Sequence, residues 1–200
     1  MARTIGVILA GGKSSRMGAD KTTVQLAGQP LIAHVMARLA PQVDEVAIVS
    51  NTAPERFALF RCPVFADRIA GAPGPLAGAH AAAEHFPDDE LVTVAVDLPF
   101  LPRTLVARLR TASQDTDCVY ATCGDRHALA IWWRAGQADA IAAFLDAGGR
   151  RITEWLRTHG EAMSIAPRPY EDLRFNINTP ADLACAERRI VSGKWEICNS

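Results

Sequence analysis

Short apolar runs alternate with amphipathic stretches along most of the chain. Runs that are apolar at nearly every position predict buried strands at residues 5–10, 45–49, 64–65, 91–96, 118–121 and 128–133. Stretches with the spacing of a helical face predict helices at residues 30–39, 75–86, 102–112, 137–147, 151–159 and 179–190. This alternation predicts an α/β fold in which a doubly wound, mainly parallel sheet carries helices on both faces.

Several predicted helices are bounded by residues that favour helix ends. Gly148 and Gly160 each follow a helical stretch, where a residue without a Cβ allows the chain to turn. Thr179 is placed to cap the last helix, with Pro180 in its first turn and Asp182 where a capping box needs a carboxylate. These signals define the helix ends more closely than the apolar pattern does.

The size and composition fit one domain. The chain has 200 residues, 49% of them apolar, which is enough to bury a core without metal or disulfide support. We expect the domain to span residues 1–192 and residues 193–200 to form a disordered tail. The net charge of −1 argues against a nucleic-acid partner, and no apolar run approaches the ~18 residues of a membrane span.

The cysteines and the N-terminal region indicate where the protein works. The five cysteines are odd in number and none form a Cys-x-x-Cys pair, which disfavours a disulfide framework or a zinc site. The apolar run at residues 5–10 is too short for a signal-peptide core with a cleavage site. We therefore expect reduced thiols and a cytoplasmic location.

Glycines and cations follow the first predicted strand. In an open parallel sheet, ligands bind beyond the carboxyl ends of the strands. Gly11 and Gly12 let backbone amides approach a phosphate closely, and Arg16 and Lys21 add positive charge. A P-loop is excluded because that motif needs a glycine where this chain has Val7. The loop therefore predicts phosphate binding by a different glycine-rich turn.

Carboxylates and an amide follow other strands at the same edge. Asp97 closes the most apolar strand and is the best candidate for a Mg²⁺ ligand, since Mg²⁺ takes one or two carboxylates plus substrate phosphates. Asp67 either contacts the ligand or caps its loop, and Asn51 either reads a base edge or caps the following turn. The convergence of these groups with the glycine loop predicts a nucleotide site.

Three further features stand apart from that loop. Gly78 lies within a predicted helix at a cost of about 1 kcal/mol relative to alanine, so a close neighbour must explain it, either the sheet or a ligand. Asn176 and Asn178 share one face of an extended segment, and helix capping does not account for them. His127 stands beside Arg126 in a predicted loop, a position that by itself assigns it no role.

Taken in order, these motifs resemble those of the molybdenum cofactor guanylyltransferases. The resemblance extends from about Thr4 to Ala186 and rests on residues 9–12, 16–18, 20–21, 74–78, 97–99 and 176–180. The glycine–arginine–lysine loop alone is typical of the wider nucleotidyltransferase superfamily, whereas the full set is more specific. The resemblance implies a Rossmann-like nucleotidyltransferase fold.

The resemblance also implies a reaction and its binding residues. It implies transfer of GMP from GTP to the terminal phosphate of molybdopterin, with release of pyrophosphate. The implied GTP contacts, with Mg²⁺ on the last of them, are Leu9, Ala10, Gly11, Gly12, Lys21, Asn51, Asp67 and Asp97. The implied molybdopterin contacts are Gly74, Gly78, Arg151, Asn176 and Asn178.

One position departs from the family pattern, and protein partners follow only from the family. Relatives often have proline where this chain has Ala128, so the resemblance gives no role to the preceding His127. The family also implies transient contact with proteins of cofactor biosynthesis or with apo-molybdoenzymes.

The chemistry of these residues fits an in-line transfer without a covalent intermediate. Lys21 and Arg16 would neutralise the phosphates, and Mg²⁺ on Asp97 would bridge phosphate oxygens, so these three are the expected catalytic residues. The acceptor phosphate is already ionised near neutral pH, so no general base is needed.

Two other functions stay open at this point. One is a related transferase that uses CTP or another phosphate acceptor. Gly11 favours GTP, because cytidylyl-transferring relatives tend to carry alanine there. The second is a non-catalytic GTP-binding module. The set of Arg16, Lys21 and Asp97 argues against it, since binding alone needs no metal at the α-phosphate.

Overall fold

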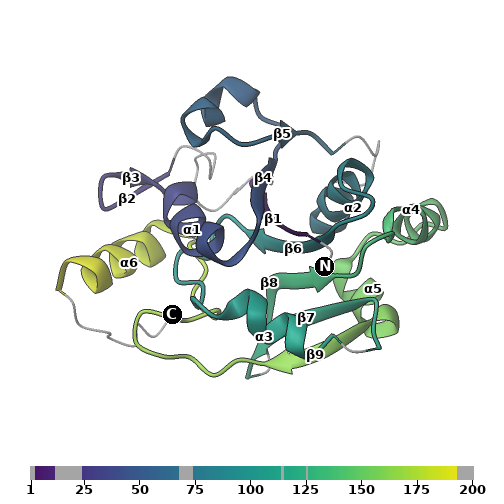
Figure 1. The fold of residues 1–200 in the computed structure, drawn as a ribbon. Coiled ribbons are helices and arrows are strands. Elements are labelled where there is room, and N and C mark those ends of the chain that lie inside the picture. The colour runs from purple at the N-terminus through teal and green to yellow at the C-terminus, as the bar shows by residue number, and fades with distance from the viewer. Residues whose placement is uncertain (1–2, 12–23, 68–73, 114, 125, 193–200) are drawn as a thin grey trace.

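A seven-stranded sheet forms the centre of the protein, in a computed structural model that describes residues 3–11, 24–67, 74–113, 115–124 and 126–192. The strand order is β5-β4-β1-β6-β8-β7-β9 (Figure 1). Only β8 runs against the others. The strands are β1 (Thr4–Leu9), β4 (Glu45–Val49), β5 (Val64–Phe65), β6 (Glu90–Ala95), β7 (Cys118–Cys123), β8 (Arg126–Trp133) and β9 (Gly160–Ser164).

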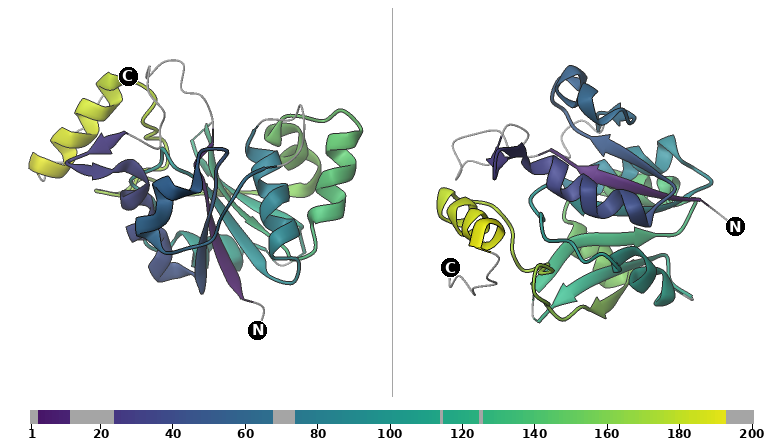
Figure 2. Two further views of the ribbon diagram at one scale, coloured as in Figure 1. Left: turned by 90° about the horizontal axis from the view of Figure 1, so that it is seen from above. Right: turned by 60° about the vertical axis from the view of Figure 1, so that its left-hand side comes forward.

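Helices cover both faces of this sheet, as the sequence pattern predicts (Figure 2). One face packs against α1 (Leu31–Leu39) and α3 (Leu105–Thr111). The other packs against α2 (Pro75–His85), α4 (Ala138–Asp146) and α5 (Ile152–His159). A third cluster joins α6 (Pro180–Ser192) to the hairpin of β2 (Gln25–Leu26) and β3 (Gln29–Pro30). Short 3₁₀ helices η1 (Ala40–Gln42) and η2 (Pro54–Phe60) complete the fold.

The continuous apolar runs follow from burial on both faces. In β1, Ile5 and Val7 pack on the α2 side while Ile8 packs on the α1 side, and all three are fully buried. A central parallel strand has no solvent-facing side, so it needs an apolar residue at nearly every position. The predicted strands at 5–10 and 91–96 are therefore confirmed, each one residue later than the observed β1 and β6.

Two elements were not predicted from the pattern. The β2–β3 hairpin turns at Ala27 and Gly28, both with positive φ, where alanine gives no turn signal. The edge strand β9 has no fully buried residue, so it lacks an apolar pattern. Its first residue, Gly160, ends α5 as predicted, but in an extended conformation that starts the strand.

The helix cap at the start of α6 is confirmed. The Asp182 carboxylate accepts from the Thr179 amide at 2.8 Å, and the Thr179 hydroxyl accepts from the Asp182 amide at 3.1 Å. The expected tail at 193–200 lies outside the described residues.

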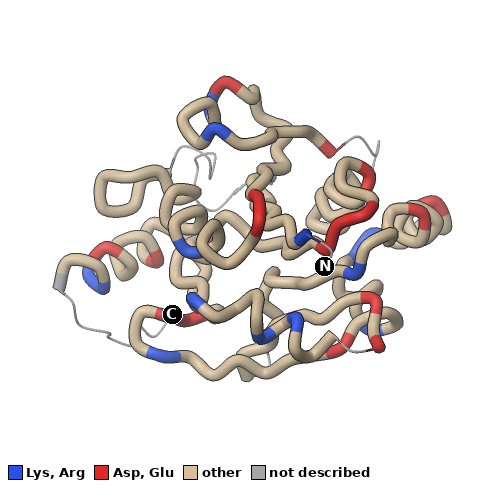
Figure 3. Tube along the Cα trace, viewed as in Figure 1, with Lys and Arg blue, Asp and Glu red and all other residues tan. Residues whose placement is uncertain are grey.

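The cysteines only partly follow the expectation of reduced thiols. Cys62, Cys118 and Cys123 are free, whereas Cys185 on α6 is disulfide-bonded. Among the helices of the described ranges, none is long and apolar enough to cross a membrane. Acidic and basic positions are interspersed along the described trace (Figure 3).

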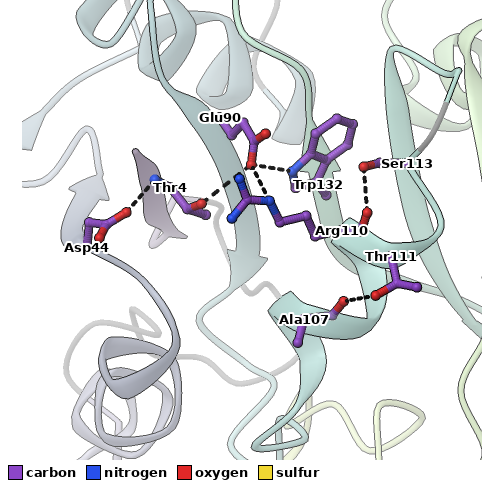
Figure 4. A network of polar contacts seen from close by, with 8 residues as sticks. All are labelled: Thr4, Asp44, Glu90, Ala107, Arg110, Thr111, Ser113 and Trp132. Atoms are coloured by element: carbon purple, nitrogen blue, oxygen red, sulfur yellow. Dashed lines mark hydrogen bonds and ion pairs between the residues drawn. The ribbon is translucent and has the colours of Figure 1, made fainter. Parts of the chain in front are cut away.

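A polar network ties the elements together at the amino edge of the sheet (Figure 4). The Glu90 carboxylate, at the start of β6, pairs with the Arg110 Nε at 3.2 Å and accepts from the Trp132 indole at 3.3 Å. The Thr4 hydroxyl lies 3.5 Å from the same oxygen. These contacts join β1, β6, β8 and α3 at the end opposite to the predicted site.

Candidate active site

A cavity of about 310 Å³ opens at the carboxyl edge of the sheet. It is enclosed by the ends of β1, β4 and β6, by the residues after them, and by the start of α2. Its lining consists of Leu9, Gly11, Val49, Ser50, Asn51, Asp67, Gly74, Pro75, Gly78, Ala95, Val96, Asp97 and Leu129. Residues predicted from five separate parts of the sequence thus meet in one place, as the parallel topology requires.

The end of β1 is fixed by its neighbours on both sides. The Ala10 amide donates to the Val49 carbonyl at 2.8 Å, and the Leu9 carbonyl accepts from the Val96 amide at 3.2 Å. Ala10 itself is buried and does not line the cavity, so any contact it makes is through its backbone. Gly11 is exposed, and a Cβ built there would meet no atom of the described residues within 4 Å.

Three predicted site residues lie outside the described residues. They are Gly12, Arg16 and Lys21, in the stretch 12–23 that follows the described end of the loop. Their roles therefore stay predictions from the sequence.

Asn51 and Asp67 form a pair at one end of the cavity. The Asn51 Nδ2 donates to the Asp67 Oδ1 at 3.0 Å, joining the residues that follow β4 and β5. A carboxylate can only accept, so the amide nitrogen of Asn51 has to face it. The bond uses one of the two Nδ2 hydrogens, so the pair leaves the Asn51 amide oxygen and the second Asp67 oxygen as acceptors and one Asn51 hydrogen as a donor.

Asp97 lies at the centre of the carboxyl edge, beyond β6. It is 8% exposed and lines the cavity. Its carbonyl accepts from the Ile177 amide at 3.0 Å, which attaches the segment before α6 to this point. Asp97 thus places a carboxylate between the ends of β1 and β8.

The Asp97 carboxylate fits a magnesium ion that arrives with its substrate. Within the described ranges, no group of three or more His, Cys, Asp or Glu residues is arranged to hold a metal. Asp97, the predicted metal ligand, lines the cavity, however. Mg²⁺ keeps several waters and commonly binds one or two carboxylates together with substrate phosphates, so a preformed cage is not required.

Sheet packing explains the glycine within α2. A Cβ on Gly78 would lie 2.9 Å from the Leu9 Cδ2 and 3.5 Å from the Val49 Cγ1, so glycine lets the helix pack on the sheet without a shift of the Leu9 side chain. Gly74, just before α2, has φ +152, which side chains disfavour. Both glycines also line the cavity, so they shape it through the backbone.

The other predicted acceptor residues do not line this cavity. Asn176 and Asn178 flank Ile177, whose amide donates to the Asp97 carbonyl. The backbone amide of Asn178 donates to the Asp182 carboxylate at 3.0 Å. Arg151 is exposed and immediately precedes α5. Because β9 follows α5 and starts beside the start of β7, Arg151 lies toward the carboxyl edge.

Leu129 lines the cavity but was not predicted as a site residue. It lies near the start of β8, whose antiparallel direction brings its first residues to the carboxyl edge. Site residues are expected just after each parallel strand, whereas an antiparallel strand brings its first residues to the carboxyl edge. An apolar run followed by no crossover helix, as at β7 and β8, is the signal that would have indicated the reversal.

Comparison with known proteins agrees with this geometry. Residues 6–162 match the family described as the MobA-like NTP transferase domain. A molybdenum cofactor guanylyltransferase of Rhodopseudomonas palustris is 42% identical, over 92% of this chain and 93% of the relative. One of Mesorhizobium japonicum is 37% identical, over 94% of this chain and 96% of the relative.

Solved structures show the same fold. Molybdopterin-guanine dinucleotide biosynthesis protein A of Archaeoglobus fulgidus has a TM-score of 0.73 and 27% identity, covering 95% of this chain and all of that one. A CMP:2-keto-3-deoxy-manno-octonic acid synthetase with bound CTP has a TM-score of 0.75 at 14% identity, covering 96% of this chain and all of that one, which supports the fold alone. On its sequence and its fold, the chain belongs to the MobA-like NTP transferase family, and is a nucleotidyltransferase.

Proposed function

We propose that the protein transfers GMP from GTP to the terminal phosphate of molybdopterin, forming the guanine dinucleotide cofactor and releasing pyrophosphate. Two molybdenum cofactor guanylyltransferases match over nearly their whole length. The predicted nucleotide residues that the structure describes lie at one cavity, all lining it except Ala10. The cavity volume of about 310 Å³ lies at the lower end of the range typical of small-molecule sites.

The Asn51–Asp67 pair is the observation that carries the choice of GTP. It presents two acceptors, and guanine presents two neighbouring donors, N1–H and the N2 amino group, on one edge. Cytosine offers one amino group beside the acceptor N3, so it would leave an acceptor of the pair facing another acceptor. Leaving such a group without a donor costs about 1–3 kcal/mol.

The transfer step follows from charge and position. The acceptor phosphate oxygen attacks the α-phosphorus, a new P–O bond forms, and the bond to pyrophosphate breaks in line with it. Asp97 would hold Mg²⁺, which neutralises phosphate charge when bound. Arg16 and Lys21 would stabilise the phosphates, and the leaving pyrophosphate takes the bonding electron pair. No residue has to carry a proton, because the acceptor phosphate is ionised.

The remaining contacts belong to the acceptor and to its delivery. Gly74, Gly78, Arg151, Asn176 and Asn178 are proposed to hold molybdopterin. We place the reaction in the cytoplasm, with transient contact to proteins that supply the cofactor or to apo-molybdoenzymes that receive it.

The decisive assay incubates the protein with Mg²⁺, molybdopterin and either GTP, CTP or ITP, followed by mass analysis and pyrophosphate measurement. We expect the guanine dinucleotide and one pyrophosphate per turnover with GTP. A preference for CTP, or transfer to a different acceptor, would support the related-transferase alternative. Tight GTP binding with no pyrophosphate release would support a non-catalytic binding module.

A sharper test addresses the base. ITP lacks the N2 amino group, so the parent should prefer GTP over ITP by roughly 10–100-fold in kcat/KM. Asp67→Asn keeps the size of the side chain but replaces one acceptor. It should lower the ratio of kcat/KM for GTP to kcat/KM for ITP. Asp89→Asn, at the amino edge of the sheet, is the matched control and should leave it unchanged. An unaltered ratio in Asp67→Asn would remove the pair from base recognition.

A further inference from the structure

His127 lies at the same edge of the sheet as the cavity, on the strand beside Asp97. Because β8 runs against β6, with Val94 opposite Ala130, the first residues of β8 reach the carboxyl edge. Leu129 lines the cavity, and His127 is the second residue of the same strand, so the prediction of a loop at His127 is wrong: β8 begins two residues before the apolar run. The side chain of His127 is exposed.

A change of register directs this end of β8. Tyr120 pairs with Ile131, yet Thr122 pairs with His127, where unbroken register would place Leu129. Such irregularities redirect side chains and are frequent beside active sites. The shift leaves Leu129 at the cavity and sets His127 opposite Thr122.

The shift also brings two rings together. The imidazole of His127 and the ring of Tyr120 have centroids 5.2 Å apart, with planes inclined by 49°. Tyr120 is half-buried and packs with the α2, α4 and α5 side of the sheet. Residues paired across an antiparallel ladder share a face, so His127 lies on this side too, the side that carries α5 and the preceding Arg151.

The nucleotide residues occupy the other half of the edge. Gly11, Asn51 and Asp67 follow β1, β4 and β5, which lie on one side of β6 and Asp97. On the other side, β8 and β7 are displaced by about 5 and 10 Å from β6, at the usual strand spacing. A second substrate that reacts next to Asp97 therefore extends over the ends of β8 and β7.

We propose that His127, supported by Tyr120, stacks against the planar pterin ring system of the acceptor and so positions its phosphate for transfer. This inference rests on the proposed function, because the acceptor it names is molybdopterin. An exposed imidazole packed against a half-buried tyrosine ring offers a planar heteroaromatic ligand both apolar surface and an offset-stacked or edge contact. His127 is a positioning residue, since it contacts the acceptor away from the reacting phosphate.

The test compares two substitutions at one position. His127→Ala removes the ring and should raise the KM for molybdopterin about 3- to 10-fold, with the KM for GTP unchanged. His127→Phe keeps a ring without nitrogen and should restore most of the affinity. Calorimetric titration with molybdopterin in the absence of GTP should give the same order of affinities.

A matched control removes an aromatic stack at the opposite edge. His159 stacks on Trp155 with centroids 3.8 Å apart, at the end of α5 distant from Arg151. His159→Ala should leave the KM for molybdopterin unchanged. If His159→Ala raised that KM as much as His127→Ala does, the effect at His127 would come from general loosening of the fold, and the inference would be overturned.

The other outcomes are equally decisive. An unchanged KM for molybdopterin in His127→Ala, or a loss in His127→Phe as large as in His127→Ala, would overturn stacking. A rise only in the KM for GTP would place His127 on the nucleotide side. If the parent binds molybdopterin but transfers no GMP, the proposed function fails while the titrations still decide the role of His127.

Discussion

At the scale of single residues, Asp97 has two separable functions. Its backbone carbonyl accepts a hydrogen bond from the Ile177 amide, while its side chain lines the cavity. A substitution that changes only the carboxylate should therefore leave the attachment of the segment before α6 intact.

Asp97→Asn should fold normally and lose nearly all Mg²⁺-dependent transfer. The amide keeps the size of the side chain but removes the charge that Mg²⁺ requires. Pyrophosphate release across a Mg²⁺ titration, with a thermal melt of the same sample, measures both effects. Glu90→Gln is the control, because Glu90 is a carboxylate at the amino edge. Near-parent turnover in a folded Asp97→Asn protein would contradict the metal assignment.

Gly11→Ala should reduce the preference for GTP over CTP. A Cβ at Gly11 meets no described atom within 4 Å, so the methyl group acts on the ligand and not on the fold. One methyl in a pocket changes relative kcat/KM by roughly 10–200-fold at most, so full reversal is not expected.

Gly78→Ala provides the matched comparison for Gly11→Ala. Its Cβ would lie 2.9 Å from the Leu9 Cδ2, a side-chain end that can shift, so any loss of kcat/KM should be the same for both nucleotides. The measurement is kcat/KM for GTP and CTP in the parent and both variants. An unchanged ratio in Gly11→Ala would restrict Gly11 to making the turn.

At the scale of elements, the segment before α6 is held from three directions. The Ile177 amide donates a hydrogen bond to the Asp97 carbonyl. The Asp182 carboxylate accepts hydrogen bonds from the amides of residues 178 and 179. The Arg189 guanidinium lies 4.1 Å from the centre of the Phe175 ring. Helix α6 thus fixes the two asparagines relative to the cavity. This arrangement supports their proposed role on the acceptor side.

Asn178→Asp should raise the KM for molybdopterin and leave GTP affinity nearly unchanged. The new carboxylate would repel an anionic acceptor phosphate. It would also lie close to the Asp182 carboxylate, so thermal stability has to be measured in parallel. Asn178→Ala separates the two effects, because it removes the amide without adding charge. If calorimetry shows weakened GTP binding instead, the segment belongs to the nucleotide site.

The sequence predicted the elements that are buried on both faces better than those at edges. The apolar runs of β1 and β6 and the cap at Thr179 were sufficient signals because burial and capping are local properties. The two-residue strands around Gly28 and the exposed strand β9 have no such pattern. The register shift at Tyr120 depends on pairing between strands, which a single sequence does not report.

At the scale of the whole molecule, the two edges of the sheet have different tasks. Charged and polar contacts around Glu90 join the elements at the amino edge, whereas the carboxyl edge places Asp97, Asn51 and Asp67 at a cavity. Stability and activity should therefore respond to different substitutions. The pH dependence of stability can be tested independently of any substrate.

Stability should fall at alkaline pH because of Cys118. Burial raises the pKa of the Cys118 thiol from 9.0 to about 12. The unfolded chain therefore releases this proton first, so the stabilisation is present below about pH 9 and is lost as pH rises toward about 12. Cys118→Ala should flatten the free energy of unfolding over this range, measured with urea. Cys62→Ala, at a half-buried thiol, should keep most of the slope.

A chain with net charge −1 needs local positive charge to bind a polyanion. Several described cations are already paired, including Arg3 with Glu45 and Arg174 with Asp172. We therefore expect the phosphates to depend on the loop cations Arg16 and Lys21. Lys21→Ala should weaken GTP binding and slow transfer, and Arg16→Ala should mainly slow transfer, by roughly 10²–10³-fold for a lost stabilising donor. Arg134→Ala removes the same charge at the amino edge, where Arg134 donates to the Thr116 carbonyl. It should change neither the affinity for GTP nor the rate of transfer. Stopped-flow binding and single-turnover kinetics separate these effects, and parent-like values in both loop variants would place the phosphates elsewhere.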